Sequence, residues 1–186
     1  MKRQPFASLG KNCAAMTVAI GIAIASPALA AGGGGGGGSG AANTPTCKTG
    51  YVWNAKKNVC VKATSSLLDD KTLYAEGHDL ALAGRYQEAL DALGAVTNKD
   101  SMTLTMIGYA TRKMGNYDQG LAYYQQALAL DTNNVNTREY LGEAYAEKGH
   151  IDLAQAELVK VGALCGTDCE QYRDLAAAIA GKPSST

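Results

Sequence analysis

The chain has 186 residues, of which 46% are hydrophobic, so it can bury the core of one modest domain. Basic and acidic residues balance at 17 each, and the chain therefore lacks the concentrated positive charge with which proteins bind nucleic acid. The sequence also lacks a phosphate-binding glycine motif and an evident pairing of a nucleophile with a base. We accordingly expect no enzymatic activity, no cofactor and no nucleic-acid partner.

Residues 1–30 have the pattern of a secretory signal peptide. A basic start is followed by an apolar run, Ala14–Ala25, and by small residues at Ala28 and Ala30, after which cleavage is expected. A membrane anchor is the less favoured alternative, because the apolar run is shorter than the roughly 20 residues that span a bilayer. We expect an exported bacterial protein, periplasmic or secreted, with no stable membrane anchor after cleavage.

Residues 31–46 are rich in glycine and predict a flexible linker, because glycine has no side chain to bury and is costly to order. Four cysteines follow the linker, and in an oxidising compartment they favour two disulfides. Three pairings are possible, and the natural choice joins Cys47 to Cys60 and Cys165 to Cys169. A metal site at the second pair is the alternative, which the lack of a nearby histidine disfavours.

Two β-prone runs, Tyr51–Trp53 and Val59–Val61, flank a polar stretch and predict a hairpin over residues 47–61, closed by a disulfide. The pattern Cys-x-x-Gly-x-x-aromatic…Cys resembles the hairpin half of small chitin-type carbohydrate-binding modules, over about 15 residues and without that family's other cysteines. The resemblance implies that Tyr51 and Trp53 stack on a sugar ring of a cell-wall glycan. The interpretation that we favour is that Trp53 packs across the hairpin.

Glycines seven residues apart recur three times after the hairpin, as Gly77/Gly84, Gly108/Gly115 and Gly142/Gly149. They mark three units, at residues 70–100, 101–134 and 135–168. Apolar residues recur at helical spacing on both sides of the second glycine, which predicts two helices joined by a short turn. The first glycine is expected where the two helices cross, because small residues face it from the second helix: Ala89, Gly120 and Ala154.

Six positions of the middle unit carry a family resemblance: Leu104, Gly108, Gly115, Tyr117, Tyr124 and Ala127. They are similar to the signature of the tetratricopeptide repeat family. The units depart from that pattern at Thr132, where proline is common, and at Glu76 and Arg138, which replace apolar residues. The resemblance implies an all-α, helix–turn–helix superhelix of about seven helices over residues 66–181, with three repeats.

A last amphipathic stretch predicts a capping helix over residues 168–180, which would cover the exposed face of the third unit. Thr167 and Glu170 have the spacing of a capping box. The residues expected to pack inward are Leu175, Ala178 and Ile179.

The resemblance also implies that the first helices of the units line a concave groove that binds a peptide or protein segment. The candidate groove residues are Tyr74, His78, Tyr109, Arg112, Asn136, Glu139 and Glu143. The family's clamp for a C-terminal carboxylate is not expected here, because Tyr74 and His78 stand in place of its lysine and asparagine. We expect a protein-interaction scaffold or adaptor of the cell envelope. The alternatives are a merely solvated face in place of a groove, and a glycan binder that uses the hairpin.

Overall fold

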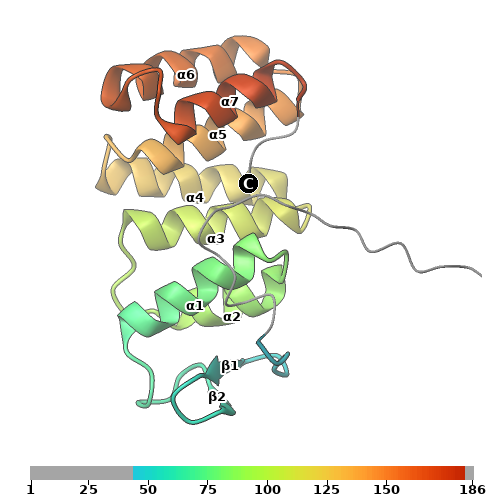
Figure 1. The fold of residues 1–186 in the computed structure, drawn as a ribbon, viewed down its shortest axis with the longest axis vertical. Coiled ribbons are helices and arrows are strands. Elements are labelled where there is room, and N and C mark those ends of the chain that lie inside the picture. The colour runs from blue at the N-terminus through green and yellow to red at the C-terminus, as the bar shows by residue number, and fades with distance from the viewer. Residues whose placement is uncertain (1–43, 183–186) are drawn as a thin grey trace, which may run out of the picture. The chain divides into compact units, whose positions relative to one another are not determined.

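The computed structural model describes residues 44–182, which form a two-stranded hairpin followed by seven helices (Figure 1). The strands are β1 (Tyr51–Asn54) and β2 (Val59–Lys62). The helices are α1 (Asp70–Leu82), α2 (Tyr86–Ala95), α3 (Ser101–Lys113), α4 (Tyr117–Leu130), α5 (Val135–Glu147), α6 (Ile151–Cys165) and α7 (Glu170–Ile179). The predicted all-α fold with a small N-terminal hairpin is confirmed. The expected signal peptide and most of the linker lie outside the described residues.

The first helix of each pair begins with the same side-chain cap. Asp69, Asp100 and Asn134 accept a hydrogen bond from the backbone N–H three residues on, which satisfies one of the free donors of the first turn. The second helices α2, α4 and α6 begin without a side-chain cap, although Asn116, the residue before α4, is of a type that often caps helices. Gly115 has a φ of 94° and follows α3 in the left-handed conformation that glycine commonly adopts at the end of a helix.

The close crossing of α3 and α4 explains the first glycine of the middle unit. A Cβ atom at Gly108 would lie 2.8 Å from the Tyr124 ring and 3.0 Å from the carbonyl oxygen of Gly120. The α5–α6 pair differs, because a Cβ atom at Gly142 would meet Leu175 of α7 at 2.7 Å. The closing helix therefore supplies the large residue that packs on this glycine.

Two clusters of buried side chains form the core. The larger one runs through α1 to α5 and is centred on residues such as Leu93 and Tyr124, both fully buried. The smaller one joins the hairpin to the first helix pair, with Val52 of β1 packed among Leu73 of α1 and Ala92 of α2. The hairpin is thus a cover for the first helix pair and not a separate module.

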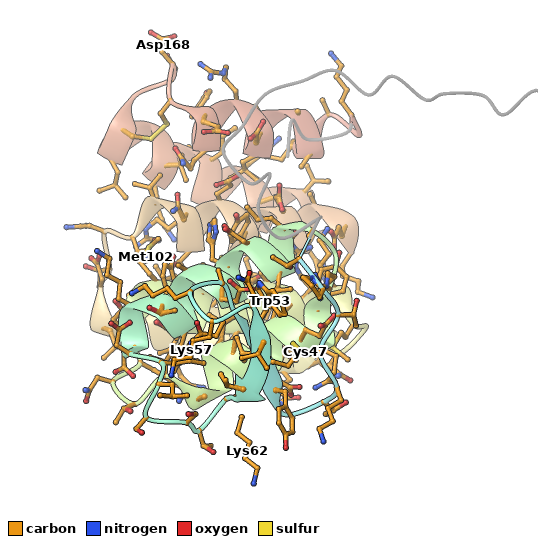
Figure 2. All side chains as sticks on the ribbon, turned by 60° about the horizontal axis from the view of Figure 1, so that its bottom comes forward. Cys47, Trp53, Lys57, Lys62, Met102 and Asp168 are labelled. Atoms are coloured by element: carbon orange, nitrogen blue, oxygen red, sulfur yellow. A yellow bond between two sulfur atoms is a disulfide. The ribbon has the colours of Figure 1, made fainter. Side chains whose placement is uncertain are left out.

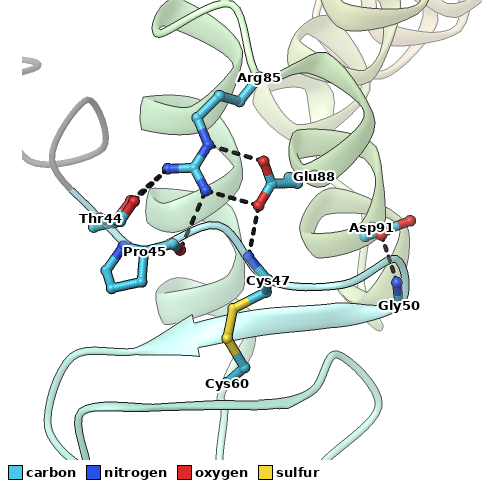
Figure 3. The surroundings of a disulfide bond; sticks show 8 residues. All are labelled: Thr44, Pro45, Cys47, Gly50, Cys60, Arg85, Glu88 and Asp91. Atoms are coloured by element: carbon cyan, nitrogen blue, oxygen red, sulfur yellow. Dashed lines mark hydrogen bonds and ion pairs between the residues drawn. A yellow bond between two sulfur atoms is a disulfide. The ribbon is translucent and has the colours of Figure 1, made fainter.

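Backbone donors of the hairpin segment are held by carboxylates of α2 (Figure 3). The N–H of Cys47 donates to Glu88 at 3.0 Å, and the N–H of Gly50 donates to Asp91 at 2.6 Å. Arg85 pairs with Glu88 at 2.7 Å and also donates to the carbonyl oxygens of Thr44 and Pro45. These contacts fix the end of the linker and the start of the hairpin against α2.

Both predicted disulfides are present, Cys47–Cys60 and Cys165–Cys169. The second one changes the expected start of the closing helix. Cys169, not Thr167, is the N-cap of α7, because the bridge ties this residue to the end of α6 and leaves Thr167 in the connecting turn. Of the residues expected to pack inward from α7, Leu175 is fully buried, and Ala178 and Ile179 are half-buried.

One contact links two departures from the repeat pattern. The guanidinium of Arg138 donates to the carbonyl oxygen of Thr132 through two nitrogens, at 3.0 and 2.6 Å, and pairs with Glu157 of α6 at 2.9 Å. Arg138 thereby holds the turn before α5, at the place where proline would restrict the backbone. An arginine at a position that is usually apolar is stabilised here because each of its three guanidinium nitrogens has a hydrogen-bond partner.

Candidate binding surface

The first helices supply the predicted groove residues from successive layers of the array. Tyr74 and His78 lie on α1 with their rings 5.9 Å apart, and both are half-buried. The Nδ1 atom of His78 lies 3.0 Å from the carboxylate of Asp79. Helix α3 contacts both α1 and α5, so it forms the middle of this surface.

An aromatic group joins α3 to its neighbours. The ring of Tyr109 lies 5.0 Å from that of Tyr140 on α5 and 6.2 Å from that of Tyr86 on α2. Burial, followed by the proximity of Tyr86, raises the pKa of Tyr109 to about 12, so its hydroxyl is neutral at physiological pH. Tyr109 remains half-buried, and it combines an apolar ring with a neutral hydrogen-bonding tip.

The structure places Arg112 differently from the sequence-based expectation of an exposed groove residue. Only 4% of its surface is exposed. One guanidinium nitrogen lies 3.3 Å from Glu143, a second pairs with Glu147, and Nε donates to the Tyr124 hydroxyl at 3.3 Å. The guanidinium is therefore committed to joining α3, α4 and α5, and it is not free for a ligand.

The two carboxylates that meet Arg112 have different environments. Burial raises the pKa of Glu143, and the positive charge of Arg112 opposes that rise. Burial would also raise the pKa of the more exposed Glu147, but the hydrogen bond and charge of Arg112 outweigh it and lower the pKa. Glu143 is thus part of the internal network, whereas Glu147 closes that network at the surface.

Glu139 is the predicted groove residue with the most unusual surroundings. It is 96% buried on α5, one turn before Glu143. Burial is the main cause that raises its pKa to about 8, and the charges of Glu143, Asp174 and Glu170 add to the effect. Within the part of the chain that the structure describes, its carboxyl makes no hydrogen bond or ion pair. The remaining candidate, Asn136, is half-buried near the start of α5.

Two cavities are lined mainly by residues outside the predicted groove. Asn136 is a predicted groove residue that lines the first of them. One, of about 570 Å³, lies beside the starts of α3 and α5, between Met102, Leu130 and Asn136. The other, of about 500 Å³, lies among α2, α3 and α4, with Leu104 and Tyr123 in its lining. These two hollows lie outside most of the surface that the predicted groove residues form over α1, α3 and α5.

The hairpin divides its side chains between two faces, as a strand should. Val52 and Asn54 are buried, whereas Tyr51 and Trp53 alternate with them and are half-buried. Figure 2 labels Trp53 and Lys62 on the two strands, at the end of the array that is turned forward in that view. The ammonium group of Lys48 lies 4.2 Å from the centre of the Tyr51 ring, so a cation already covers one face of this ring.

Several residues of the surface and of the buried network beneath it are absent from the sequence-based set: Tyr86, Tyr124, Tyr140 and Glu147. A signal for one of them exists in the sequence. Glu143 and Glu147 are four residues apart on one helix, and Arg112 lies about one repeat before them, so the three charges are brought into adjacent layers. The tyrosine contacts depend on side-chain packing between layers, for which helical spacing gives no specific signal.

Within residues 44–182, no helix is both long and apolar enough to cross a membrane. A search of the same residues finds no group of three or more histidine, cysteine, aspartate or glutamate side chains that could hold a metal ion.

Comparison with known proteins finds a family match within the array. The model of a family described as tetratricopeptide repeat matches residues 112–179. Among solved structures, that of PcrH in complex with the chaperone binding region of PopB is 23% identical, with a TM-score of 0.49, and the match covers 60% of this chain and 92% of that chain. A search of curated proteins finds no match. Over residues 112–179, therefore, the chain matches the tetratricopeptide repeat family that its repeated units resemble.

Proposed function

We propose that the array is a non-enzymatic protein-interaction module, a scaffold or adaptor of the bacterial cell envelope. It binds a peptide or protein segment on the surface formed by α1, α3 and α5. The observation that carries the proposal is the half-buried Tyr109, which lies on the middle helix and is flanked by tyrosines of two neighbouring helices. Rigid, partly exposed aromatic side chains with a polar tip are typical anchors of protein interfaces.

The buried network below this surface supports the same proposal. Arg112, Glu143 and the Tyr124 hydroxyl connect three helices under the aromatic group. A binding residue is most effective where its supporting helix cannot shift, because less ordering is then needed when the partner binds. The surface is therefore preorganised for a segment that lies across the layers.

The envelope location is supported by the two disulfides and by the predicted signal peptide. Disulfides persist in oxidising compartments and are rare in the cytosol of most organisms. Fusion of residues 1–30 to a reporter enzyme that folds only after export tests this part of the proposal. A reporter that stays inactive in cells would contradict it.

A crosslinking pull-down from envelope extracts tests the binding surface. We expect that Tyr109→Ala loses the partner that the wild-type chain recovers, because the central anchor is removed. Tyr123→Ala is the matched control, since Tyr123 is also half-buried but lines the cavity among α2, α3 and α4. Equal recovery by the wild type and Tyr109→Ala would refute the proposed surface.

A second candidate function is binding of a cell-wall glycan through the hairpin. It is favoured by the alternation in β1, which leaves Tyr51 and Trp53 on the face opposite the buried Val52. Adjacent aromatic rings on one face are suited to stacking on sugars. Sedimentation with peptidoglycan and with chitin tests it: Trp53→Ala should remain in the supernatant while the wild type sediments. Equal sedimentation of both would exclude the hairpin as the contact.

A further inference from the structure

Acidic side chains gather where α7 packs on α5. Glu139 and Glu143 are one turn apart on α5, and Glu170 and Asp174 are one turn apart on α7. We call these four residues the acidic patch. The charges of the other three members all act on the carboxyl of Glu139, which is therefore the member that all the others surround. The nearest positive charge of the network, Arg112, is already paired with Glu143 and Glu147.

Glu139 is the unusual member of the patch because it is buried without a partner. Its exposed fraction is 4%, comparable with that of Arg112, yet no donor of the described residues reaches its carboxyl. A buried carboxyl without a donor is costly, since water is lost and nothing replaces it. The carboxyl oxygens are nonetheless not completely enclosed, because neither is among the unpartnered atoms that solvent cannot reach. A small part of the Glu139 carboxyl is therefore open to solvent, and from that side a donor would have to approach.

We propose that the acidic patch is a specificity pocket for a lysine or arginine side chain of the bound segment, with Glu139 as its ion-pair partner. The inference rests on the proposed function, binding of a segment across α1, α3 and α5, and it defines the chemistry of that segment. A basic side chain supplies the donors that Glu139 lacks and offsets the repulsion among the acidic side chains. An acidic side chain would be repelled by the same group.

The protonation of Glu139 makes the proposal measurable. The free carboxyl, with a pKa of about 8, is mostly protonated at pH 7. The groups that face it are Glu143 and Tyr140 on its own helix and Glu170 and Asp174 on α7. An incoming cation favours the charged form, so binding displaces a proton into solution. Affinity for a basic segment should therefore rise as the pH is raised from 6 to 8, by up to tenfold per pH unit.

A peptide array is the first test. Twelve-residue peptides of random sequence, with lysine, arginine, alanine or glutamate fixed at the centre, are probed with the mature chain. We expect about a tenfold preference for lysine or arginine over alanine, and glutamate should bind least. Glu139→Gln, which keeps the shape of the side chain, should bind all four sets alike. The control Asp152→Asn changes an exposed carboxylate on α6 and should keep the preference.

The outcomes separate the two proposals. Binding without a preference, or a preference that Glu139→Gln retains, overturns the inference and leaves the proposed function intact. If no peptide binds at all, the proposed function is contradicted. The pocket is then decided by a second measurement, in which NMR follows the Glu139 carboxyl carbon from pH 5 to 9 with and without N-acetyl-lysine methylamide. The midpoint should fall by at least one pH unit with the lysine compound, and an unchanged midpoint overturns the pocket.

Discussion

Replacing Arg112 by methionine tests how the middle layers of the array are held together. The change removes the cation that forms an ion pair with the buried Glu143, and it also removes the donor to the Tyr124 hydroxyl. Breaking one side of a buried ion pair costs about 3–5 kcal/mol, because the remaining charge is left without compensation. The contact with Glu147 adds little, since that carboxylate is half exposed. We expect Arg112→Met to lower the free energy of unfolding by about 3 kcal/mol.

Urea denaturation at pH 7, followed by circular dichroism, measures the effect. The double variant Arg112→Met/Glu143→Gln should recover about 1–2 kcal/mol relative to Arg112→Met, because no buried charge then remains without a partner. Lys113→Met is the control: its ammonium group also meets Glu147, at 3.4 Å, but at the surface, so the loss should stay below about 1 kcal/mol. The reasoning is refuted if Arg112→Met costs no more than Lys113→Met, or if the double variant is as unstable as the sum of its single changes.

Three further predictions concern separate parts of the fold. In the folded protein the Glu139 carboxyl holds its proton up to a pH of about 8, whereas in the unfolded chain it releases the proton above its ordinary pKa of 4.5. The free energy of unfolding therefore falls as the pH rises from 4.5 to about 8. Urea titrations should therefore give Glu139→Gln and wild type equal stability at pH 4, and should give the variant an advantage of about 4 kcal/mol at pH 8. A stability difference that is the same at both pH values would contradict this. Replacing Cys47 and Cys60 by serine should lower the free energy of unfolding by about 3 kcal/mol. In hydrogen exchange, the amides of the hairpin should then exchange before those of the helices. Simultaneous exchange of the hairpin and all helices would contradict this. Gly108→Ala should destabilise the fold by about 1–3 kcal/mol, since its Cβ would lie 2.8 Å from the buried ring of Tyr124. Gly94→Ala is the control and should be neutral or stabilising, because a Cβ there would meet no atom within 4 Å. Similar melting temperatures of the two variants in thermal melts would disprove the close crossing at Gly108.

The helical layers were predictable because their signals are local. Gly115 adopts the left-handed conformation that its place between two apolar stripes predicts, and α3 begins at Ser101, the first residue of the middle unit. The spacing of apolar residues along a helix depends only on the backbone period, so it can be recognised without knowledge of tertiary contacts. The same reasoning placed Gly108 at a helix crossing, where the structure has it.

Contacts between layers were less predictable, because they depend on which long side chains turn inward. The position of Arg112 in the repeat predicts that its side chain is exposed. It is buried instead, because it forms ion pairs with two carboxylates of α5. The docking of the hairpin was missed for a similar reason. Its backbone donors meet Glu88 and Asp91, which are 41 residues further along the chain and look like ordinary surface residues of α2.

The clasp between Arg85 and the chain at Thr44 and Pro45 has a mechanical consequence. A pull on the chain before Thr44 first loads the hydrogen bonds of Arg85, then the bond from the Cys47 N–H to Glu88, and then the covalent bridge to Cys60. Tension is thus shared between α2 and the second strand before it reaches the helices from α3 onward. The surface over α3 and α5 is thus separated from a load at Thr44 by the contacts that Arg85 and Glu88 make.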